Sequence, residues 1–454
     1  MIGFEAEVDV PIFQDIAGME GVVFDGEQDV KAIYSFLFGG HEKTDATILK
    51  NDEFTIKPDV SDYPGQQLFE ALAAIDPTFA AHTPRRAGKP MPVLIRKMEY
   101  ITPPINEMDA AADQIYERQA ASIKGHLAQF GPQAAQKVFH LPETNCYVGI
   151  PVQEIQQLIR KTQNPAQVAE ANNALTNIQL KVQQRFALQA TAGIFPSIIP
   201  ELFRRRLLDE PSPKLKQAWD IAFPMIATLV QKVFDDEEIK KEAWMQRLTG
   251  NDVHLQAFKG HLCLLSSYVI GDALSESTLF ENMSAKNAVP YHAKINLGYI
   301  HKALPEGFVK VAPAPPPEAD EEHLVPKIAA VLTEDNETRK DIWLERKFGL
   351  KKRPIKPKER REHLVIDAHL DFVINALFDR QVQTLINQSI GRNPNEKAHE
   401  LVDPDAVPPG KDGEKGVQLE FRRLGMDEVA PGELAGKFMA VVTTVRELNK
   451  PRIA

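Results

Sequence analysis

Carboxylates spaced two residues apart open the chain. The segment Ile2-Gly3-Phe4-Glu5-Ala6-Glu7-Val8 alternates apolar and acidic residues. In a β-strand, this alternation places Glu5 and Glu7 on one face. Two carboxylates on a half-buried face are unfavourable unless a positive charge lies between them, and a divalent cation bound to phosphate supplies such a charge. The spacing therefore predicts a cation or phosphate site, with a solvated strand face as the plainer alternative.

Further carboxylates occur in strand-like segments far along the chain. Glu99 lies in a segment that ends in Thr102-Pro103-Pro104, and Glu420 and Arg422 alternate at 417–424. Only a shared sheet would bring these side chains together with those of the first segment. An ion pair across a sheet edge is the alternative for Glu420 and Arg422.

The composition is that of a globular protein. The 454 residues are 43% hydrophobic with a mean hydropathy of −0.28, enough for a sizeable core. The net charge of −10 argues against a general nucleic-acid binder. The longest apolar run, 262–270, is far shorter than the roughly 20 residues that span a bilayer. Two cysteines give no disulfide framework or zinc pattern, and no secretory signal is visible, so we expect a cytoplasmic protein.

Hydrophobic periodicity predicts the secondary structure. Strands are expected at 2–10, 54–60, 93–101, 144–151 and 417–424. Helices are expected at 66–75, 106–130, 152–161, 165–192, 197–208, 213–234, 237–248, 252–275, 363–388 and 432–448. Gly193 is then most simply the C-cap of the long helix at 165–192.

This order of elements predicts an α+β fold, with an antiparallel sheet and helices on one side. The last strand must return to the first sheet. We expect a single domain, 1–454, with a helical insert at 152–310. A Pro-rich and then acidic linker follows at 311–323, and residues 324–454 would hold more helices and the closing strand.

Four segments, in order, resemble the glutamate–cysteine ligase and amidoligase families, which share the glutamine-synthetase catalytic fold. They are Gly3-Phe4-Glu5-Ala6-Glu7, Ile56-Lys57-Pro58-Asp59-Val60-Ser61, Met98-Glu99-Tyr100-Ile101-Thr102-Pro103-Pro104 and Leu419-Glu420-Phe421-Arg422. They are similar to the families' G-h-E-h-E, D-G-S, E-h-h-S-P-P and E-F-R strands, where h is apolar. The resemblance implies an antiparallel sheet of that type with a large helical insert packed on one side.

The resemblance also implies ATP- and Mg²⁺-dependent amide formation through an acyl phosphate. The implied metal ligands are Glu5, Glu7, Glu99 and, as a fourth, Glu420. Arg422 would contact the transferring phosphoryl group, and Asp59 would orient the incoming amine or accept its proton. Asn145 and Ser61 would line the nucleotide or acceptor pocket.

Two weaker candidates for substrate or nucleotide binding come from the residues themselves. Gln189 lies at the expected end of the 165–192 helix. Lys294, with Lys286, flanks Tyr291-His292 in an expected loop, where a phosphate contact is conceivable.

The chain departs from the family pattern at two places. Many relatives carry a polar pair, His-x-His or Gln-x-Thr, on the strand before V-G-h-P, and here those places fall on Asn145 and Tyr147. The D-G-S string is Asp59-Val60-Ser61, which a simple turn also explains.

Alternatives to a ligase that joins a small-molecule carboxylate and an amine stay open. Tyr147 in place of a polar residue favours a catalytically decayed interaction module on the same fold. A carboxylate kinase, or a ligase that modifies a protein side chain, would use the same scaffold, as would a secreted bacterial effector domain. The expected partners are a small-molecule or protein carboxylate and an amine, without nucleic acid or a membrane.

Overall fold

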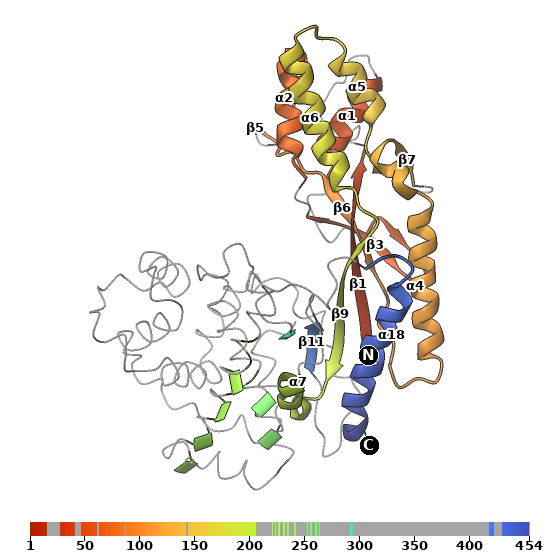
Figure 1. Ribbon diagram of the computed structural model, residues 1–454, viewed down its shortest axis with the longest axis vertical. Coiled ribbons are helices and arrows are strands. Elements are labelled where there is room, and N and C mark those ends of the chain that lie inside the picture. Colours follow the sequence, from red (N-terminus) through yellow and green to blue (C-terminus); the bar gives the residue numbers. More distant parts are fainter. Residues whose placement is uncertain are drawn as a thin grey trace, which may run out of the picture.

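The computed structural model describes residues 1–15, 28–40, 47–60, 63–86, 88–141, 144–205, scattered positions from 220 to 263, 291–293, 417–421 and 429–453. Within these residues, nine strands form one sheet in which every pairing is antiparallel. The order is β10-β11-β9-β1-β6-β3-β2, with β8 beside the end of β1 and β7 beside β8. This antiparallel sheet, with helices beside it, confirms the expected α+β class (Figure 1).

The strands of this sheet are β1 (Ile2–Gln14), β2 (Leu49–Lys50), β3 (Thr55–Val60), β6 (Arg96–Ile101), β7 (Val138–His140), β8 (Cys146–Gly149), β9 (Phe186–Ile194), β10 (Tyr291–Ala293) and β11 (Val417–Phe421). A separate hairpin pairs β4 (Arg85–Arg86) with β5 (Lys89–Pro90). The longer helices are α1 (Gln28–Phe38), α2 (Gly65–Ile75), α4 (Ala112–Ala128), α5 (Val152–Ile159), α6 (Pro165–Lys181) and α18 (Leu434–Asn449), and α3 (Pro77–Ala81) and α7 (Ile199–Arg205) are short.

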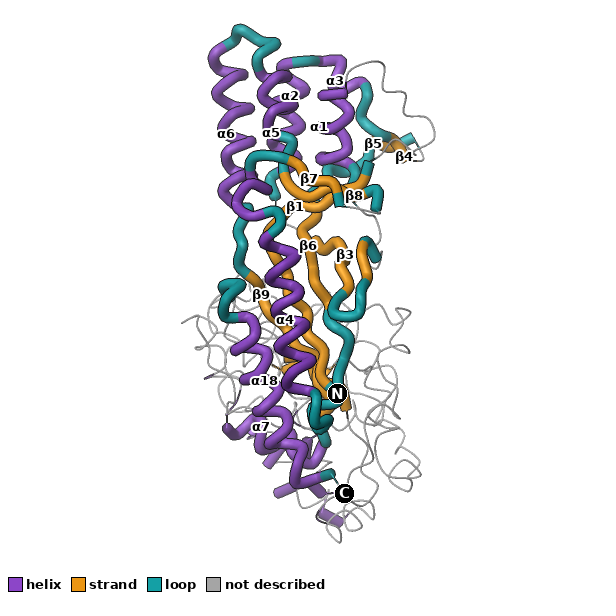
Figure 2. The backbone as a smooth tube through the Cα atoms, turned by 90° about the vertical axis from the view of Figure 1, so that its right-hand side faces the viewer, coloured by secondary structure: helices purple, strands orange, loops and turns teal. Residues whose placement is uncertain are grey.

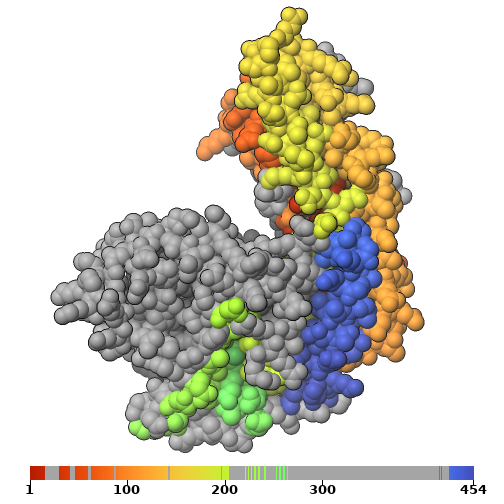
Figure 3. Space-filling view, in the orientation of Figure 1, coloured from red at the N-terminus to blue at the C-terminus, as the bar shows by residue number. Residues whose placement is uncertain are grey.

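Strict alternation makes one face of the sheet apolar. In β1, even-numbered residues from Ile2 to Ile12 are buried. Helices α4 and α18 cover this face and lie side by side (Figures 2 and 3). The Phe4 ring stacks on Phe438 of α18 at 3.8 Å between ring centroids and meets the Tyr116 ring of α4 edge-on. The burial of these rings fixes which face of the sheet is left for polar side chains.

Two prolines sit where a strand can accept them. Pro11 lies at the register shift between Val8 and Pro11 in the pairing of β1 with β6, where the ladder is already interrupted. Pro58 pairs with Met98 of β6, but β2 reaches only as far as Ile56 on the other side of β3. Among the described strands, Pro58 therefore has an edge position, as its residue type predicts.

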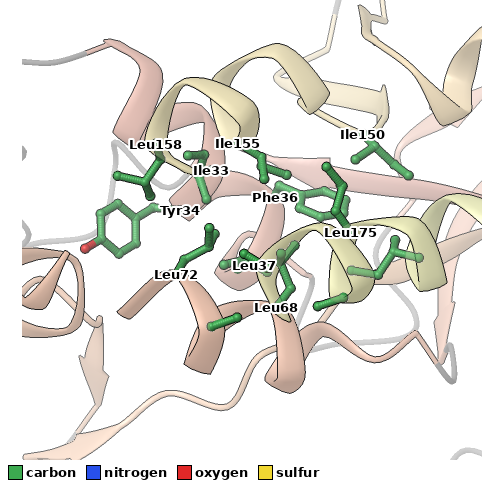
Figure 4. Close-up of a cluster of buried hydrophobic side chains, with 14 of the residues drawn as sticks. Ile33, Tyr34, Phe36, Leu37, Leu68, Leu72, Ile150, Ile155, Leu158 and Leu175 are labelled. Carbon is green, nitrogen blue, oxygen red and sulfur yellow. The ribbon is translucent and has the colours of Figure 1, made fainter. Parts of the chain in front are cut away.

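A helical bundle forms one end of the molecule. Helices α1, α2, α5 and α6 bury a continuous apolar cluster that includes Ile33, Leu72, Ile155 and Leu175 (Figure 4). Phe13 of β1 belongs to this cluster and meets Phe36 of α1 edge-on at 5.5 Å between ring centroids. The bundle is thus anchored on the far end of the central strand.

The expected helix at 165–192 is wrong in its second half. The helix starts where Asn164 caps it, with its side chain accepting from the Ala166 N–H, and it ends at Lys181. Residues 186–194 are instead strand β9, inserted between β1 and β11. Gly193 lies inside that strand and is not a helix C-cap. The expected helical insert at 152–310 is therefore interrupted by a strand of the main sheet.

Some of the other expected elements are present, and some lie outside the described residues. The strands expected near 2–10, 54–60, 93–101, 144–151 and 417–424 are present as β1, β3, β6, β8 and β11. Helix α1 and strand β7 were not expected from the sequence. The linker at 311–323 and the helix at 363–388 lie outside the described residues. Among the described helices, none is long and apolar enough to cross a membrane.

Candidate functional site

The face of the sheet opposite α4 and α18 carries the acidic residues that the sequence singles out. We call it the polar face and define it by Glu5 and Glu7 (β1), Asp59 (β3), Lys97 and Glu99 (β6), and Gln189 and Thr191 (β9). Cross-strand register brings them together. Glu7 lies opposite Glu99, Glu5 opposite Gln189, and Lys97 opposite Asp59. Residues of four segments far apart in sequence thus share one surface.

The Glu7 carboxylate is held by contacts to two neighbouring strands. Its Oε2 atom lies 2.6 Å from Lys97 Nζ, and its Oε1 atom accepts a hydrogen bond of 2.7 Å from Gln189 Nε2. The side chains of Glu7 and Lys97 are each 16% exposed, so water screens this pair only weakly. The structure therefore fixes the orientation of the Glu7 carboxylate from both sides.

Lys97 also reaches Asp59, whose Oδ2 atom is 3.7 Å from Nζ. Burial on its own lowers the pKa of Lys97, but the neighbouring carboxylates of Glu7, Asp59 and Asp9 outweigh it and raise that pKa above its ordinary value. Lys97 is accordingly a firmly charged ammonium group. It supplies the positive charge that the spacing of the carboxylates calls for, and it bridges strands β1, β6 and β3.

Among the residues that the structure describes, two buried acceptor atoms on the polar face have no hydrogen-bond partner, namely Oε1 of Gln189 and Oγ1 of Thr191. Gln189 is 8% exposed. Because an ionised carboxylate only accepts hydrogen bonds, the Gln189 amide must point Nε2 at Glu7, which leaves Oε1 facing elsewhere. Buried polar atoms are nearly always satisfied, so these two are suited to donors of a bound molecule.

Gln189 and Thr191 lie on β9, directly beside β1 and on the same face as Glu5. The helix expected at 165–192 concealed this placement. A period-two reading of 186–194 as a strand would have found it.

Asn145 is not brought to this face. It is exposed and precedes β8, and its carbonyl oxygen accepts from the backbone N–H of Asp15. Cys146 pairs with Gln14, seven residues beyond Glu7 on β1, which is roughly 20 Å along a strand. Tyr147 stacks on Phe13 beside the helical bundle. The nucleotide or acceptor role expected for Asn145 therefore has no support from its position.

Several predicted residues fall outside what is described. Ser61, Arg422 and Lys294 are outside the described residues. Glu420 is described only as backbone, and it pairs with Thr191 on one side and His292 on the other. The segment Tyr291–Ala293, expected to be a loop, is strand β10, which pairs with β11.

The donors available to a metal ion are glutamate oxygens, which suit Mg²⁺. Glu7 and Glu99 are like charges directly opposite each other, an arrangement that a bound cation would relieve. Among the side chains that the structure describes, however, no three His, Cys, Asp or Glu residues lie close enough to hold an ion. The oxygen donors are of the kind that Mg²⁺ prefers. In this structure, however, Lys97 forms an ion pair with Glu7.

Two residues of the polar face were missed as functional candidates, Lys97 and Thr191. Lys97 is two positions before Glu99 on a strand, so period two alone places both on one face.

No family model matches this chain, and neither a curated protein nor a solved structure matches it significantly.

Proposed function

We propose that the protein is an ATP-dependent carboxylate–amine ligase that uses the polar face as its binding surface. The observation that carries the proposal is the convergence of Glu5, Glu7, Glu99 and Asp59 on one face of a single sheet. Three of the four segments that resemble amidoligases and glutamate–cysteine ligases supply these residues, and the fourth supplies β11 of the same sheet. A glutamine-synthetase type of sheet is part of this proposal.

The reaction would proceed in two group transfers. The substrate carboxylate attacks the γ-phosphorus of ATP, which forms an acyl phosphate and releases ADP. The amine then attacks the acyl carbon, which forms the amide, releases phosphate and frees one proton. Mg²⁺, when bound, would neutralise phosphate oxygens during the first transfer.

The residues of the chain would divide the remaining work. Glu5, Glu7 and Glu99 would hold the cation, with Glu420 as a fourth ligand, through hard oxygen atoms. Gln189 Oε1 and Thr191 Oγ1 would accept hydrogen bonds from substrate N–H or O–H groups. Asp59, whose side chain is 30% exposed, would take the proton that the amine loses. Arg422 would contact the phosphoryl group.

Nucleotide binding tests the proposal directly. Calorimetric titration with ATP, with and without Mg²⁺, would compare the wild type with Glu99→Gln. This variant removes a negative charge from the polar face and keeps the shape of the side chain. We expect Mg²⁺-dependent ATP binding in the wild type and a loss of at least about tenfold in the variant, as for one removed ion contact.

Glu117→Gln is the matched control, because Glu117 is exposed on α4 behind the opposite face of the sheet. It should bind ATP as the wild type does. Absence of ATP binding in the wild type would sink the ligase proposal and favour the alternative of an interaction module on the same scaffold. Equal losses in Glu99→Gln and Glu117→Gln would show that the polar face is not the binding surface.

A further inference from the structure

Lys97 holds a position that none of the roles above assigns. From β6 it contacts Glu7 of β1 on one side, with Nζ 2.6 Å from Oε2, and approaches Asp59 of β3 on the other, at 3.7 Å. It therefore connects a predicted metal ligand with the predicted proton acceptor. The side chain of Lys97 is 16% exposed, so little water can take the place of its ammonium group beside the two carboxylates.

The contact with Lys97 bears on what Glu7 can bind. Gln189 donates to one carboxylate oxygen of Glu7 and Lys97 donates to the other. A divalent cation that approached Oε2 would meet the Lys97 ammonium group within contact distance, and like charges so close repel strongly where little water lies between them. The ammonium group and a metal ion cannot share Oε2 in this arrangement.

We propose that Lys97 is a resident counter-ion that occupies Glu7 in the metal-free protein and must leave it before a divalent cation binds there. This inference rests on the proposed function, since it concerns the same carboxylates. Asp59 provides the place to which Lys97 moves, because its carboxylate is already close. Lys97 is thus a positioning residue, which couples metal binding at Glu7 to pairing of Lys97 with Asp59.

The test measures Mn²⁺ affinity by titration of free Mn²⁺, without nucleotide or turnover. Lys97→Met removes the competing ammonium group. Lys57→Met is the matched control, because Lys57 lies on the same face opposite Glu99 and forms no ion pair in the described part of the structure. Both variants lower the charge of the face by one unit. We expect Lys97→Met to bind Mn²⁺ about tenfold more tightly than Lys57→Met, a typical coupling between two competing groups.

A second variant keeps the inference testable if Lys97→Met does not fold. Lys97→Arg preserves the charge and can hold a carboxylate through two parallel hydrogen bonds, so it should bind Mn²⁺ more weakly than the wild type. Thermal unfolding should agree, with Mn²⁺ raising the midpoint of Lys97→Met more than that of the wild type.

Equal Mn²⁺ affinities of Lys97→Met and Lys57→Met would overturn the inference, as would equal or tighter binding by Lys97→Arg than by the wild type. If the wild type still binds ATP with Mg²⁺, that result leaves the proposed ligase function standing. Absence of both Mn²⁺ and ATP binding in every protein overturns the inference and the proposed function together.

Discussion

The hydrogen bond from Gln189 to Glu7 can be tested by exchanging a single group. Gln189→Glu replaces the amide nitrogen by an oxygen and keeps the shape of the side chain. Gln189 Nε2 is 2.7 Å from Glu7 Oε1, and Gln189 is 8% exposed. When ionised, the introduced carboxyl group would lie about 4 Å from that of Glu7, where the repulsion at an effective dielectric of 20 is about 4 kcal/mol.

Two effects set the net result. The ammonium group of Lys97 offsets part of the repulsion, so we expect the free energy of unfolding to fall by about 2–3 kcal/mol at pH 8. When protonated, the introduced carboxyl group donates to Glu7 as the amide does. Its pKa in the folded protein is therefore raised above the unfolded value of about 4.3. Stability is thus retained at low pH and lost as the pH rises through the folded-state pKa.

Urea unfolding followed by circular dichroism, at pH 5 and pH 8 with EDTA present, would measure the difference. Gln66→Glu is the matched control, because Gln66 Nε2 donates to Glu70 Oε1 at 2.9 Å on the exposed face of α2. Screening by water should limit its effect to about 0.5 kcal/mol at either pH. The same loss at both pH values for Gln189→Glu, or a loss no larger than that of the control, would refute this account of the polar face.

Three further predictions concern the framework of the site. Phe438→Ala removes the ring that stacks on Phe4 and should lower the free energy of unfolding by about 3–5 kcal/mol in urea titrations. Burial lowers the pKa of His126, beside Tyr100, to about 4. The free energy of unfolding should therefore decrease as the pH falls from about 6.5 to 4, and His126→Gln should weaken this pH dependence. Gly149→Ala should lower the thermal midpoint, because φ is +111° and a Cβ would lie 2.2 Å from a backbone oxygen.

Local pattern was sufficient for much of the framework. The alternation around Glu5 and Glu7 predicted both the strand and its acidic face, and the structure places both side chains on the polar face. The same rule predicted the strands that hold Asp59 and Glu99. These predictions succeeded because the direction of side chains in a strand depends only on the backbone of that strand.

The strand at 186–194 shows where local pattern misled. Its Ala-Leu-Gln-Ala-Thr-Ala composition continues the helix-favouring sequence of α6, and β propensity is weak in such residues. The decisive factor is tertiary, because β1 has an edge whose N–H and C=O groups need partners, and β9 supplies them from Ile2 to Val8. Only that pairing brings Gln189 and Thr191 beside Glu5.

The sequence by itself determined which residues share a face within each strand, and hence that the chain carries several acidic strand faces. Tertiary structure decided which strands are neighbours, and therefore that Glu7 meets Lys97 and Gln189 while Asn145 lies at the far end of the sheet. The reason is physical. Side-chain direction is set by local backbone geometry, whereas pairing between strands depends on contacts between distant residues, such as Glu7 and Gln189, 182 positions apart, which no local pattern encodes.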